Sequence, residues 1–351
     1  MILEAKLKTG ASAPFFMKYT SAFLIALFTG LLFSCSSGPK YQIIRLQGEA
    51  QGTTFQITVL SDTEMDLERP VDSILRAVDR SMSPWLPTSL ISRINQGDTS
   101  VRVDPMFEVV FRKSQELNSI SKGYFDITVG GLANAWGFGP NGPMELDSAR
   151  VDSLMQYVGM DRVRIQGQKV YLEKEGIRFD FNAIAQGYSV DLICAYLDGL
   201  SVQNYLVEIG GELRSKGKNL EEKTWRIGID KPTAQRASDP FQAIIELPNK
   251  ALATSGNYRK FRTDEVTGKK YVHTINPLTG YTAQQNLLSA TIVAQEAMVA
   301  DGYSTMCMAM GLKKSIQLIE ADSTLEGMLV YSKANGDWAV YQSAGFEKLV
   351  R

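Results

Sequence analysis

The chain of 351 residues carries 37 basic and 38 acidic residues, so its formal net charge is −1, and no long run of either sign interrupts it. This balance excludes the basic patch that nucleic-acid-binding proteins need, so we expect no nucleic-acid partner. With 44% hydrophobic residues, the chain is long enough to bury a large core. A single histidine and three cysteines provide no ligand cluster for zinc or iron–sulfur, so a metal would have to bind oxygen.

The chain begins with the pattern of an export signal. From Met17 it has a lysine, an apolar run at residues 22–33 and a small residue before Cys35. The run is shorter than a membrane span needs. The ending Leu-Phe-Ser-Cys resembles a bacterial lipobox in which Cys35 is acylated, although phenylalanine is unusual there, and an ordinary secretory signal cut nearby is the alternative. We expect a lipid-anchored protein of the bacterial cell envelope that faces the periplasm.

The predicted domain organisation follows from this signal. Residues 1–34 are the signal peptide, with Met17 as a possible true start, and residues 35–40 are a tether. Because no internal repeat or low-complexity linker divides the rest, residues 41–351 are expected to form one compact domain. Cys194 and Cys307 stand in apolar helical patterns and are expected to be small core residues, although a disulfide between them stays open.

Strands and helices follow one another irregularly along the mature chain. Strands are expected at residues 41–50, 53–60, 204–209, 224–229, 242–247, 288–294, 327–332 and 338–342, and on both sides of a turn near Gly167 within residues 162–181. Helices are expected around residues 71–78, from Asp104-Pro105 to Gly123, from Asp147 to Gly159 and at residues 298–311. Most strands are joined by turns, which favours an α+β fold with largely antiparallel sheets and flanking helices over a parallel doubly wound sheet.

The last of these helices carries an aspartate in an apolar setting. In MVADGYSTMCMAMG, residues 298–311, Met and Ala recur at helical spacing, and an ionised carboxylate there needs a cation or several donors. Residues three and four apart share a helix face, so Ser304 and Thr305 place hydroxyl oxygens beside Asp301. This stretch alone favours a self-satisfied polar cluster or a partly exposed helix, with a cation site as the alternative.

Several segments have more glycine and paired polar residues than packing requires. They are GTTF at 52–55, MSPWLPTSLISRIN at 82–95, GYFDITVGGLANAWGFG at 123–139, DFNAIAQGYSVD at 180–191 and ATSGNYRKFRTDEVTGKKYVHTINPLTG at 253–280. In its proline-rich loop, Trp85 is expected to fill a local core rather than bind a ligand. Asp180 is expected to end a strand, just before a helix whose free N–H groups suit an anion. His273 is either a structural residue or a base near pH 7.

Taken together, these segments resemble a known family. GTTF, MSxWxPxSLISRIN, GYFDITVGGLxNxWGFG, DFNAIAQGYxVD, VEIGGELRSKG, ATSGNYRKF, HTINPLTG and AMVADGYSTMCMAMG occur in the order and approximate spacing of the ApbE-type FAD:protein FMN transferases, from Gly52 to about Gly311. The resemblance implies an ApbE-like fold and an enzyme that uses FAD and Mg²⁺. A threonine or serine hydroxyl of a target protein then attacks the FAD pyrophosphate, FMN becomes attached through a phosphodiester, and AMP leaves.

The resemblance also implies which residues hold the metal and move the proton. Asp301 and Thr305 match magnesium ligands of the family, the backbone carbonyl of Ala183 matches another, and Ser304 is expected close by. Magnesium prefers oxygen ligands, waters and substrate phosphates, and it would compensate the charge of Asp301. His273 or a nearby carboxylate is expected to accept the proton of the attacking hydroxyl, and the sequence does not choose between them. The predicted catalytic residues are His273 and the metal ligand Asp301.

Positions that match flavin and substrate contacts of the family are spread over the motifs. Those for the flavin are Gln51, Trp85, Tyr124, Phe125, Asp126, Asp180, Gln186 and Ile275, while Ser255 and Arg259 lie with His273 in the substrate-pocket motifs. Gln51 stands where the family often has methionine, Gln186 where lysine or glutamate is common, and Trp85 where tyrosine is common. These departures put single contacts in question, while the class of ligand is unchanged.

The sequence is also compatible with two other functions. With water in place of the acceptor hydroxyl, the same site would be a FAD pyrophosphatase that releases FMN and AMP. A non-catalytic flavin-binding lipoprotein is the alternative from another class, although a binder has no need of the predicted metal site. Family acceptors carry a short Ser/Thr motif on exported subunits of redox pumps, such as the sodium-translocating NADH:quinone reductase and the Rnf complex. The expected partners are therefore FAD, such a subunit and a membrane.

Overall fold

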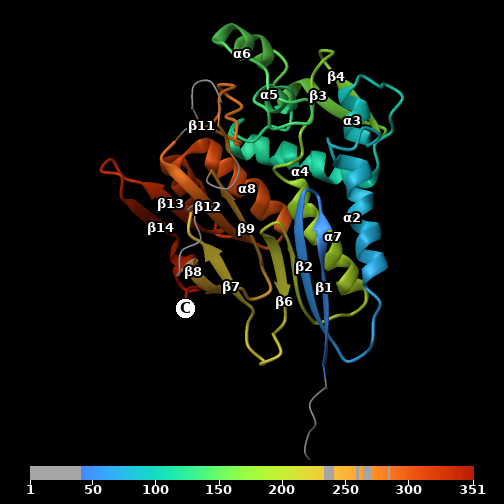
Figure 1. The fold of residues 1–351 in the computed structure, drawn as a ribbon, viewed down its shortest axis with the longest axis vertical. Helices are drawn as coiled ribbons and strands as arrows, with labels where there is room; N and C mark the ends of the chain where they lie inside the picture. The colour runs from blue at the N-terminus through green and yellow to red at the C-terminus, as the bar shows by residue number, and fades with distance from the viewer. Residues whose placement is uncertain (1–40, 233–240, 258–260, 264–269, 284) are drawn as a thin grey trace, which may run out of the picture. The chain divides into compact units, whose positions relative to one another are not determined.

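The central feature of the fold is an eight-stranded sheet in which every pair of neighbouring strands is antiparallel (Figure 1). The computed structural model describes residues 41–232, 241–257, 261–263, 270–283 and 285–351. The strand order across the sheet is β1 (Gln42–Ala50), β2 (Thr53–Ser61), β5 (Asn204–Ile209), β6 (Glu212–Lys216), β9 (Ala251–Gly256), β12 (Leu287–Ala294), β13 (Glu326–Ser332) and β14 (Trp338–Gln342). Cys35 and Arg259 lie outside the described residues, so the predictions for them stay predictions.

Three hairpins and a set of helices complete the fold. The hairpins are β3 (Val163–Gln166) with β4 (Lys169–Leu172), β7 (Arg226–Asp230) with β8 (Phe241–Glu246), and β10 (Phe261–Thr263) with β11 (Lys270–Val272). The helices are α2 (Glu68–Met82), α3 (Leu90–Asn95), α4 (Pro105–Ser121), α5 (Gly130–Ala135), α6 (Ser148–Met155), the 3-10 turn η1 (Met160–Arg162), α7 (Ala185–Gly199), α8 (Ala297–Met310), α9 (Leu312–Ala321) and α10 (Ala344–Glu347). The predicted α+β fold with antiparallel sheets is confirmed. In the described part of the chain, no helix is long and apolar enough to cross a membrane.

Local sequence signals explain where two of the helices begin. The side chain of Asp104 accepts a hydrogen bond from Phe107 N, and Pro105 occupies the first turn of α4, as predicted. Asp147 caps α6 in the same way by accepting from Arg150 N. Helix α6 ends at Met155, earlier than predicted, and Val151 is its only residue that is fully buried.

The prediction that Asp180 ends a strand is wrong. Within the described structure, residues 173–182 contain no strand, and only Arg178 forms an isolated parallel bridge, with Val129. The backbone pairs with residues 127–130 only on either side of Phe179: Gly130 N donates to Arg178 O, and Asp180 N donates to Ile127 O. Phe179 itself bonds to the side chain of Asn95 in the SLISRIN motif, since Phe179 N donates to Asn95 Oδ1 at 2.7 Å and Asn95 Nδ2 donates to Phe179 O at 2.9 Å.

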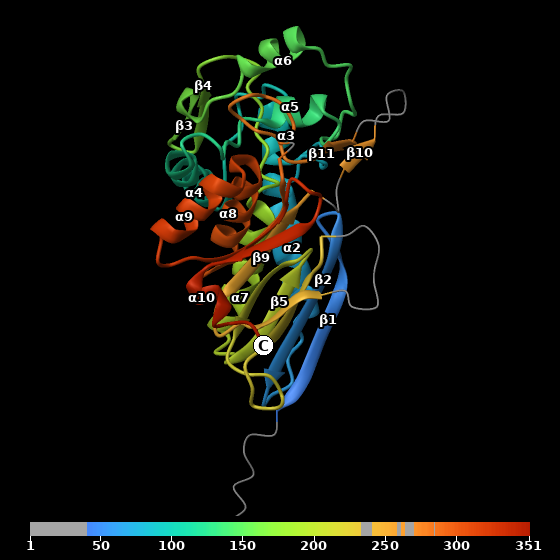
Figure 2. The ribbon, with the colours of Figure 1, turned by 90° about the vertical axis from the view of Figure 1, so that its left-hand side faces the viewer.

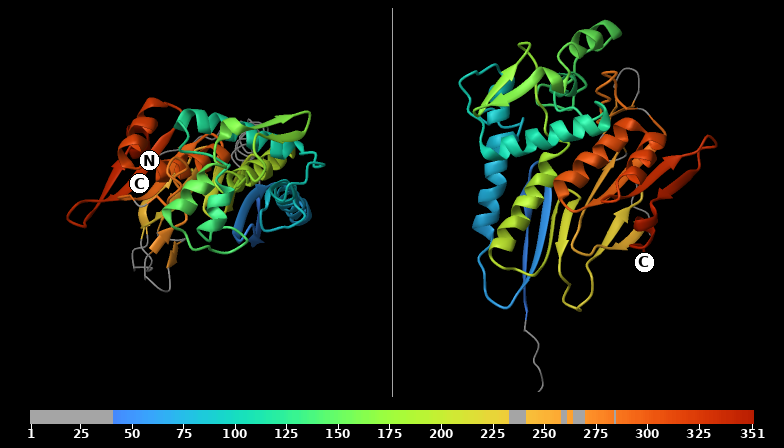
Figure 3. Two further views of the ribbon diagram at one scale, coloured as in Figure 1. Left: turned by 90° about the horizontal axis from the view of Figure 1, so that it is seen from above. Right: turned by 180° about the vertical axis from the view of Figure 1, so that it is seen from behind.

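The two faces of the sheet are covered differently. Helices α2, α7 and α8 lie side by side over one face, as the view from behind shows (Figure 3). The hairpin β7–β8 and helix α10 pack on the opposite face, where Ile227, Ile245 and Phe346 contact residues of β6, β9, β12 and β13. Strand β12 is therefore buried on both faces, which explains its nearly continuous apolar sequence, LLSATIVA.

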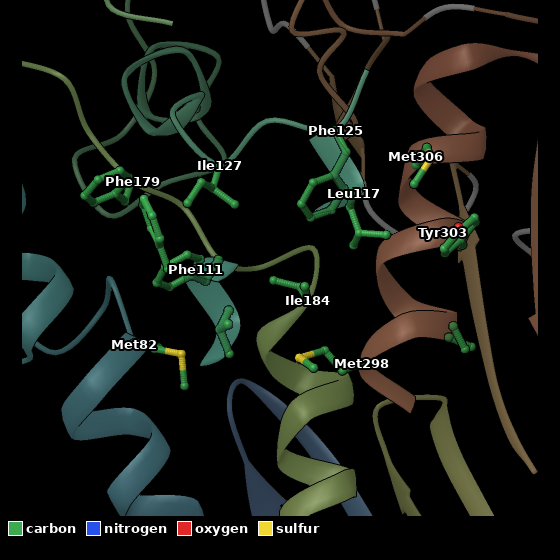
Figure 4. Packing of buried hydrophobic residues seen from close by; sticks show 14 of the residues in the cluster. Met82, Phe111, Leu117, Phe125, Ile127, Phe179, Ile184, Met298, Tyr303 and Met306 are labelled. Atoms are coloured by element: carbon green, nitrogen blue, oxygen red, sulfur yellow. The ribbon is translucent and has the colours of Figure 1, made fainter. Parts of the chain in front are cut away.

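The segments between α2 and α7 lie together at one end of the sheet. Figure 2 shows α3, α5, α6 and the β3–β4 hairpin at that end, above α4 and α8. The largest cluster of buried side chains connects them to the helices on the sheet, and Figure 4 shows Leu117, Phe125 and Tyr303 within it, beside α8. This core fixes the N-terminal half of α7 and the middle of α8 against the glycine-rich motifs.

Candidate active site

The centre of the candidate site is the contact between α7 and α8. Asp301 lies on α8, is only 3% exposed, and accepts a hydrogen bond at its Oδ2 from Gly187 N of α7 at 3.0 Å. A Cβ atom at position 187 would lie 2.4 Å from Ala297 O and 2.8 Å from Asp301 Cβ. Only glycine allows the two helices to approach this closely, which brings the DFNAIAQGYSVD motif to the predicted metal ligand.

Three hydroxyl groups gather beside Asp301. Ser255, near the end of β9, places its Oγ 2.8 Å from Ser304 Oγ and 3.1 Å from Thr305 Oγ1. Ser304 is fully buried, and its Oγ donates to the backbone carbonyl of Asp301 at 2.9 Å. Thr305 is partly exposed. Of the two helix hydroxyls, Thr305 is therefore the one that a ligand can reach.

The chemistry of these donors fits a magnesium ion. The site offers a carboxylate and hydroxyl oxygens, and the partly exposed Ala183 lies two residues before α7 begins. Among the described residues, no group of three His, Cys, Asp or Glu could hold a metal by itself. Magnesium commonly binds through one or two carboxylates and completes its shell with waters and substrate phosphates, which matches such a sparse set.

A second carboxylate, which the sequence analysis did not single out, connects the same two helices. Asp191 of α7 accepts hydrogen bonds from Ala297 N at 3.0 Å and Met298 N at 2.8 Å, and forms an ion pair with Arg214 of β6 at 2.8 Å. Burial raises the pKa of the Asp191 carboxyl, while the two amides and the arginine act in the opposite direction. The signal in the sequence was the same as for Asp301, an aspartate within an apolar helical pattern.

Two tight turns bring further motif residues to the start of α7. Gln51 has a φ of 53° in the β1–β2 turn, and its Nε2 donates to Ser189 Oγ at 2.7 Å. Gly210 has a φ of 62° in the β5–β6 turn, where a Cβ atom would lie 2.6 Å from Nε2 of Gln186. Gln51 and Gln186 thus lie at the same helix end although their motifs are distant in the sequence.

Asp126 and Asp180 organise the loops next to this end. Asp126 accepts hydrogen bonds from Thr128 N and Oγ1 at 2.8 and 2.6 Å and from Met160 N at 3.0 Å. Asp180 accepts from Asn182 N at 2.7 Å, in the turn that precedes α7. Burial raises the pKa of both carboxyl groups above the ordinary value. Asp126 therefore connects the loop between α4 and α5 to η1, and Asp180 shapes the turn that carries Ala183.

His273 and Ile275 stand on the segment that follows β11. His273 is partly buried, with its ring edge-on to Phe138 at 6.5 Å between centroids. Ile275 is 8% exposed and packs in a separate apolar cluster with Leu132, Trp136 and Val151. The HTINPLTG motif is thereby fixed to the WGFG motif, and Trp136 Nε1 donates to Gly280 O at 2.8 Å.

The three aromatic residues predicted to contact flavin have different surroundings. Trp85 is 60% exposed, so the expectation that it fills a local core is wrong. Phe125 is buried against α8, beside Leu117 (Figure 4). Tyr124 is partly exposed and accepts a hydrogen bond from Lys314 Nζ, which also lies 4.4 Å from the centre of its ring. Trp85 and Tyr124 are thus open to a ligand, and Phe125 supports the helix behind the site.

The comparisons with known proteins agree with this fold and with these motifs. The sequence model of the ApbE family matches residues 51–329, and the chain belongs to this family. It is 35% identical over 350 residues to the FAD:protein FMN transferase of Haemophilus influenzae, covering 95% of this chain and 99% of the relative. It is 32% identical over 332 residues to the protein of that name from Vibrio cholerae, covering 92% of this chain and 97% of the relative.

Solved structures give the same result. The structure is similar to that of the flavin transferase ApbE from Vibrio cholerae, with a TM-score of 0.78 and 30% identity over 88% of this chain and 99% of that chain. The apo form of the flavinyl transferase ApbE from Pseudomonas stutzeri gives a TM-score of 0.77 with 29% identity, covering 88% of this chain and 97% of that chain.

Proposed function

We propose that this protein is an enzyme that transfers FMN from FAD to an acceptor protein. Relatives that carry this activity in their names match nearly the whole chain. The observation that carries the proposal is the meeting of three distant motifs at one point. Gly187 of DFNAIAQGYSVD contacts Asp301 across 114 positions of the sequence, and Ser255 of ATSGNY contacts Ser304 across 49.

The proposed reaction forms one bond to phosphorus and breaks another. A threonine or serine hydroxyl of the acceptor attacks the phosphorus on the FMN side of the FAD pyrophosphate. A new P–O bond joins FMN to the acceptor as a phosphodiester, the pyrophosphate P–O bond breaks, and AMP leaves with the electron pair. The proton of the hydroxyl passes to a base. Phosphoryl transfer of this kind depends mainly on positioning and on charge neutralisation.

The chain's own residues are proposed to supply positioning and the base. Asp301, Thr305 and the carbonyl of Ala183 hold Mg²⁺, which when bound neutralises charge on the pyrophosphate oxygens. Buried Ser304 supports Thr305 through Ser255, whose Oγ contacts both hydroxyls. His273 is proposed to take the proton, since the packing of its ring against Phe138 limits the orientations of the imidazole.

We further propose that the acceptor is an exported subunit of a redox pump, of the NADH:quinone reductase or Rnf type. The support is the export signal and the lipobox-like ending at Cys35, which would hold the enzyme at the periplasmic face of a membrane. Partition of the full chain into detergent, compared with a Cys35→Ser variant, tests the anchor. The wild type is expected in the detergent phase and the variant in the aqueous phase.

The activity is tested by mixing the protein with FAD, Mg²⁺ and an acceptor domain that carries the threonine motif, and weighing the acceptor by intact mass spectrometry. We expect a gain of one FMN per acceptor, which EDTA abolishes and which a threonine-to-alanine acceptor does not show. Release of AMP without a mass gain would instead establish a pyrophosphatase. If the acceptor gains no mass and no AMP is released, the protein is a flavin carrier, and the proposed transfer is contradicted.

A further inference from the structure

Helix α8 is capped by a residue of another helix. The N-cap residue of α8, Glu296, makes no side-chain capping hydrogen bond within the described structure. The carboxylate of Asp191 on α7 accepts from the N–H groups of Ala297 and Met298 instead, at 3.0 and 2.8 Å. Asp191 therefore satisfies backbone N–H groups at the start of α8 that an N-cap side chain usually satisfies. Its negative charge also interacts favourably with the positive end of the helix dipole.

The same arrangement is repeated in the opposite direction. In the described part of the chain, Ile184 at the N-cap of α7 makes no side-chain capping hydrogen bond, and the N–H of Gly187 is bonded by Asp301 of α8. Each helix thus receives a carboxylate from its partner near its N-terminus. Because Gly187 leaves no space between the backbones, a shift of α8 along α7 would break both sets of bonds.

We infer that Asp191 is a positioning residue for the metal site: it fixes α8 on α7 so that Asp301 and Thr305 face the turn that carries Ala183. This inference rests on the proposed function, because it concerns the Mg²⁺ of that reaction. Asp191 does not bind the metal itself. It acts by holding the first turn of α8, one turn before Asp301.

Arg214 completes this arrangement from the sheet. Its guanidinium contacts Asp191 at 2.8 Å, and the two side chains are only 22% and 13% exposed. A buried carboxylate needs such compensation, and Asp191 accepts from Arg214 as well as from both amides of α8. Removing a residue that orients a metal ligand without binding the metal typically lowers the metal affinity by about 10- to 100-fold.

The chain contains a matched control on the same helix and the same strand. Asp198, two turns after Asp191 on α7, pairs with Lys216 of β6 at 2.8 Å and accepts from Tyr205 Oη at 3.1 Å. Both of these partners lie on β5 and β6, not on α8. Asp198→Asn therefore perturbs an ion pair between α7 and β6 without touching the helix contact.

The test compares the full chain with its Asp191→Asn, Arg214→Gln and Asp198→Asn variants. Calorimetry gives the dissociation constant for Mg²⁺, and FMN transfer at increasing Mg²⁺ gives the half-saturating concentration and kcat. For Asp191→Asn we expect both Mg²⁺ constants to rise by about 10- to 100-fold. High Mg²⁺ should restore kcat to within about threefold of the wild type, because the ligands themselves are unchanged. Arg214→Gln should shift the constants less in the same direction, and Asp198→Asn should leave them unchanged.

Several outcomes would overturn the inference. Unchanged Mg²⁺ constants in a folded Asp191→Asn protein would do so, as would an equal shift in Asp198→Asn. If Asp191→Asn does not fold, the Mg²⁺ constants of Arg214→Gln are used instead, and unchanged constants in that variant would overturn the inference. A wild type that binds Mg²⁺ without transferring FMN would overturn only the proposed function, because the dissociation constants still test Asp191. A wild type that transfers FMN without binding Mg²⁺ would overturn the inference.

Discussion

Helix α7 makes two ion pairs with strand β6, and they differ in what else they contact. In the middle of the helix, Asp191 pairs with Arg214 and also accepts hydrogen bonds from the first turn of α8. Near its end, Asp198 pairs with Lys216, and the two side chains are 42% and 33% exposed. Similar ion pairs therefore join α7 to both β6 and α8 in one place and to β6 in the other. We expect only the Asp191 pair to affect the proposed metal site.

Replacing Thr305 tests the proposed metal site beside the Asp191 pair, and among the variants that sharpen this comparison it should have the largest effect. Thr305→Val keeps the shape of the side chain and removes its oxygen, so we expect FMN transfer to fall by at least about 100-fold. The rate of mass gain of the acceptor measures this. Thr254→Val is the matched control, because Thr254 Oγ1 contacts Thr291 Oγ1 at 2.9 Å instead of the site. A Thr305→Val enzyme as active as the control would contradict the metal assignment.

Gly187→Ala tests how close the two helices must be. The added methyl group would meet Ala297 O and Asp301 Cβ, so the helices must separate, and we expect a loss of about 1–3 kcal/mol in the free energy of unfolding. Gly199 ends the same helix, and no described atom lies within 4 Å of a Cβ placed there. Gly199→Ala should be neutral or stabilising, by up to about 1 kcal/mol. Chemical denaturation measures the free energy of unfolding of both variants. Equal changes in the two variants would argue against close packing at Gly187.

The two ion pairs should also differ in stability. Arg214→Met leaves the mostly buried carboxylate of Asp191 without its cation, and we expect a loss of about 1–3 kcal/mol. Lys216→Met removes a more exposed partner and should cost less than about 1 kcal/mol. Urea denaturation of the two variants at one pH measures the difference. Equal losses would show that burial does not distinguish the pairs.

The cysteines of α7 and α8 should have the smallest effect. Burial raises the pKa of the Cys307 thiol to about 12 and raises that of Cys194 as well. The pKa of each thiol is therefore higher in the folded than in the unfolded protein, where it is about 8.5. The contribution of the neutral thiols to stability is complete at pH values below the unfolded pKa, and it is lost as the pH rises through the folded pKa. In a Cys35→Ser protein, a thiol reagent at pH 8 should label neither cysteine before unfolding and both afterwards. Both cysteines are free thiols in the structure. Labelling of fewer than two thiols in denaturant without reductant would reveal a disulfide and contradict this.

The periodicity of the sequence predicted most elements because their causes are local. The cap at Asp104 and the alternating strands depend on neighbours within a few positions, and they were found where expected. The prediction for Asp180 failed because its segment is held by Asn95, which is distant in the sequence. The exposure of Trp85 was likewise not indicated by any local pattern.

The site was predicted only in part, for the same reason. Helical spacing predicted Ser304 and Thr305 beside the Asp301 carboxylate, whereas in the structure Ser304 Oγ donates to the backbone carbonyl of Asp301 and also contacts Ser255. Asp191 looked like one more polar residue of a helix, because its partners on α8 are 106 and 107 positions away. Spacing within one helix cannot reveal a cap that another helix supplies.

FMN transfer by an Asp301→Asn protein, measured by intact mass of the acceptor with FAD and Mg²⁺, is the most direct test of the proposed active site. The substitution keeps the size of the side chain and removes its negative charge. We expect a rate lower by about 100- to 1,000-fold, in a protein whose thermal unfolding shows that it is folded. Transfer at the wild-type rate would contradict the claim that the junction of α7 and α8 is the active site.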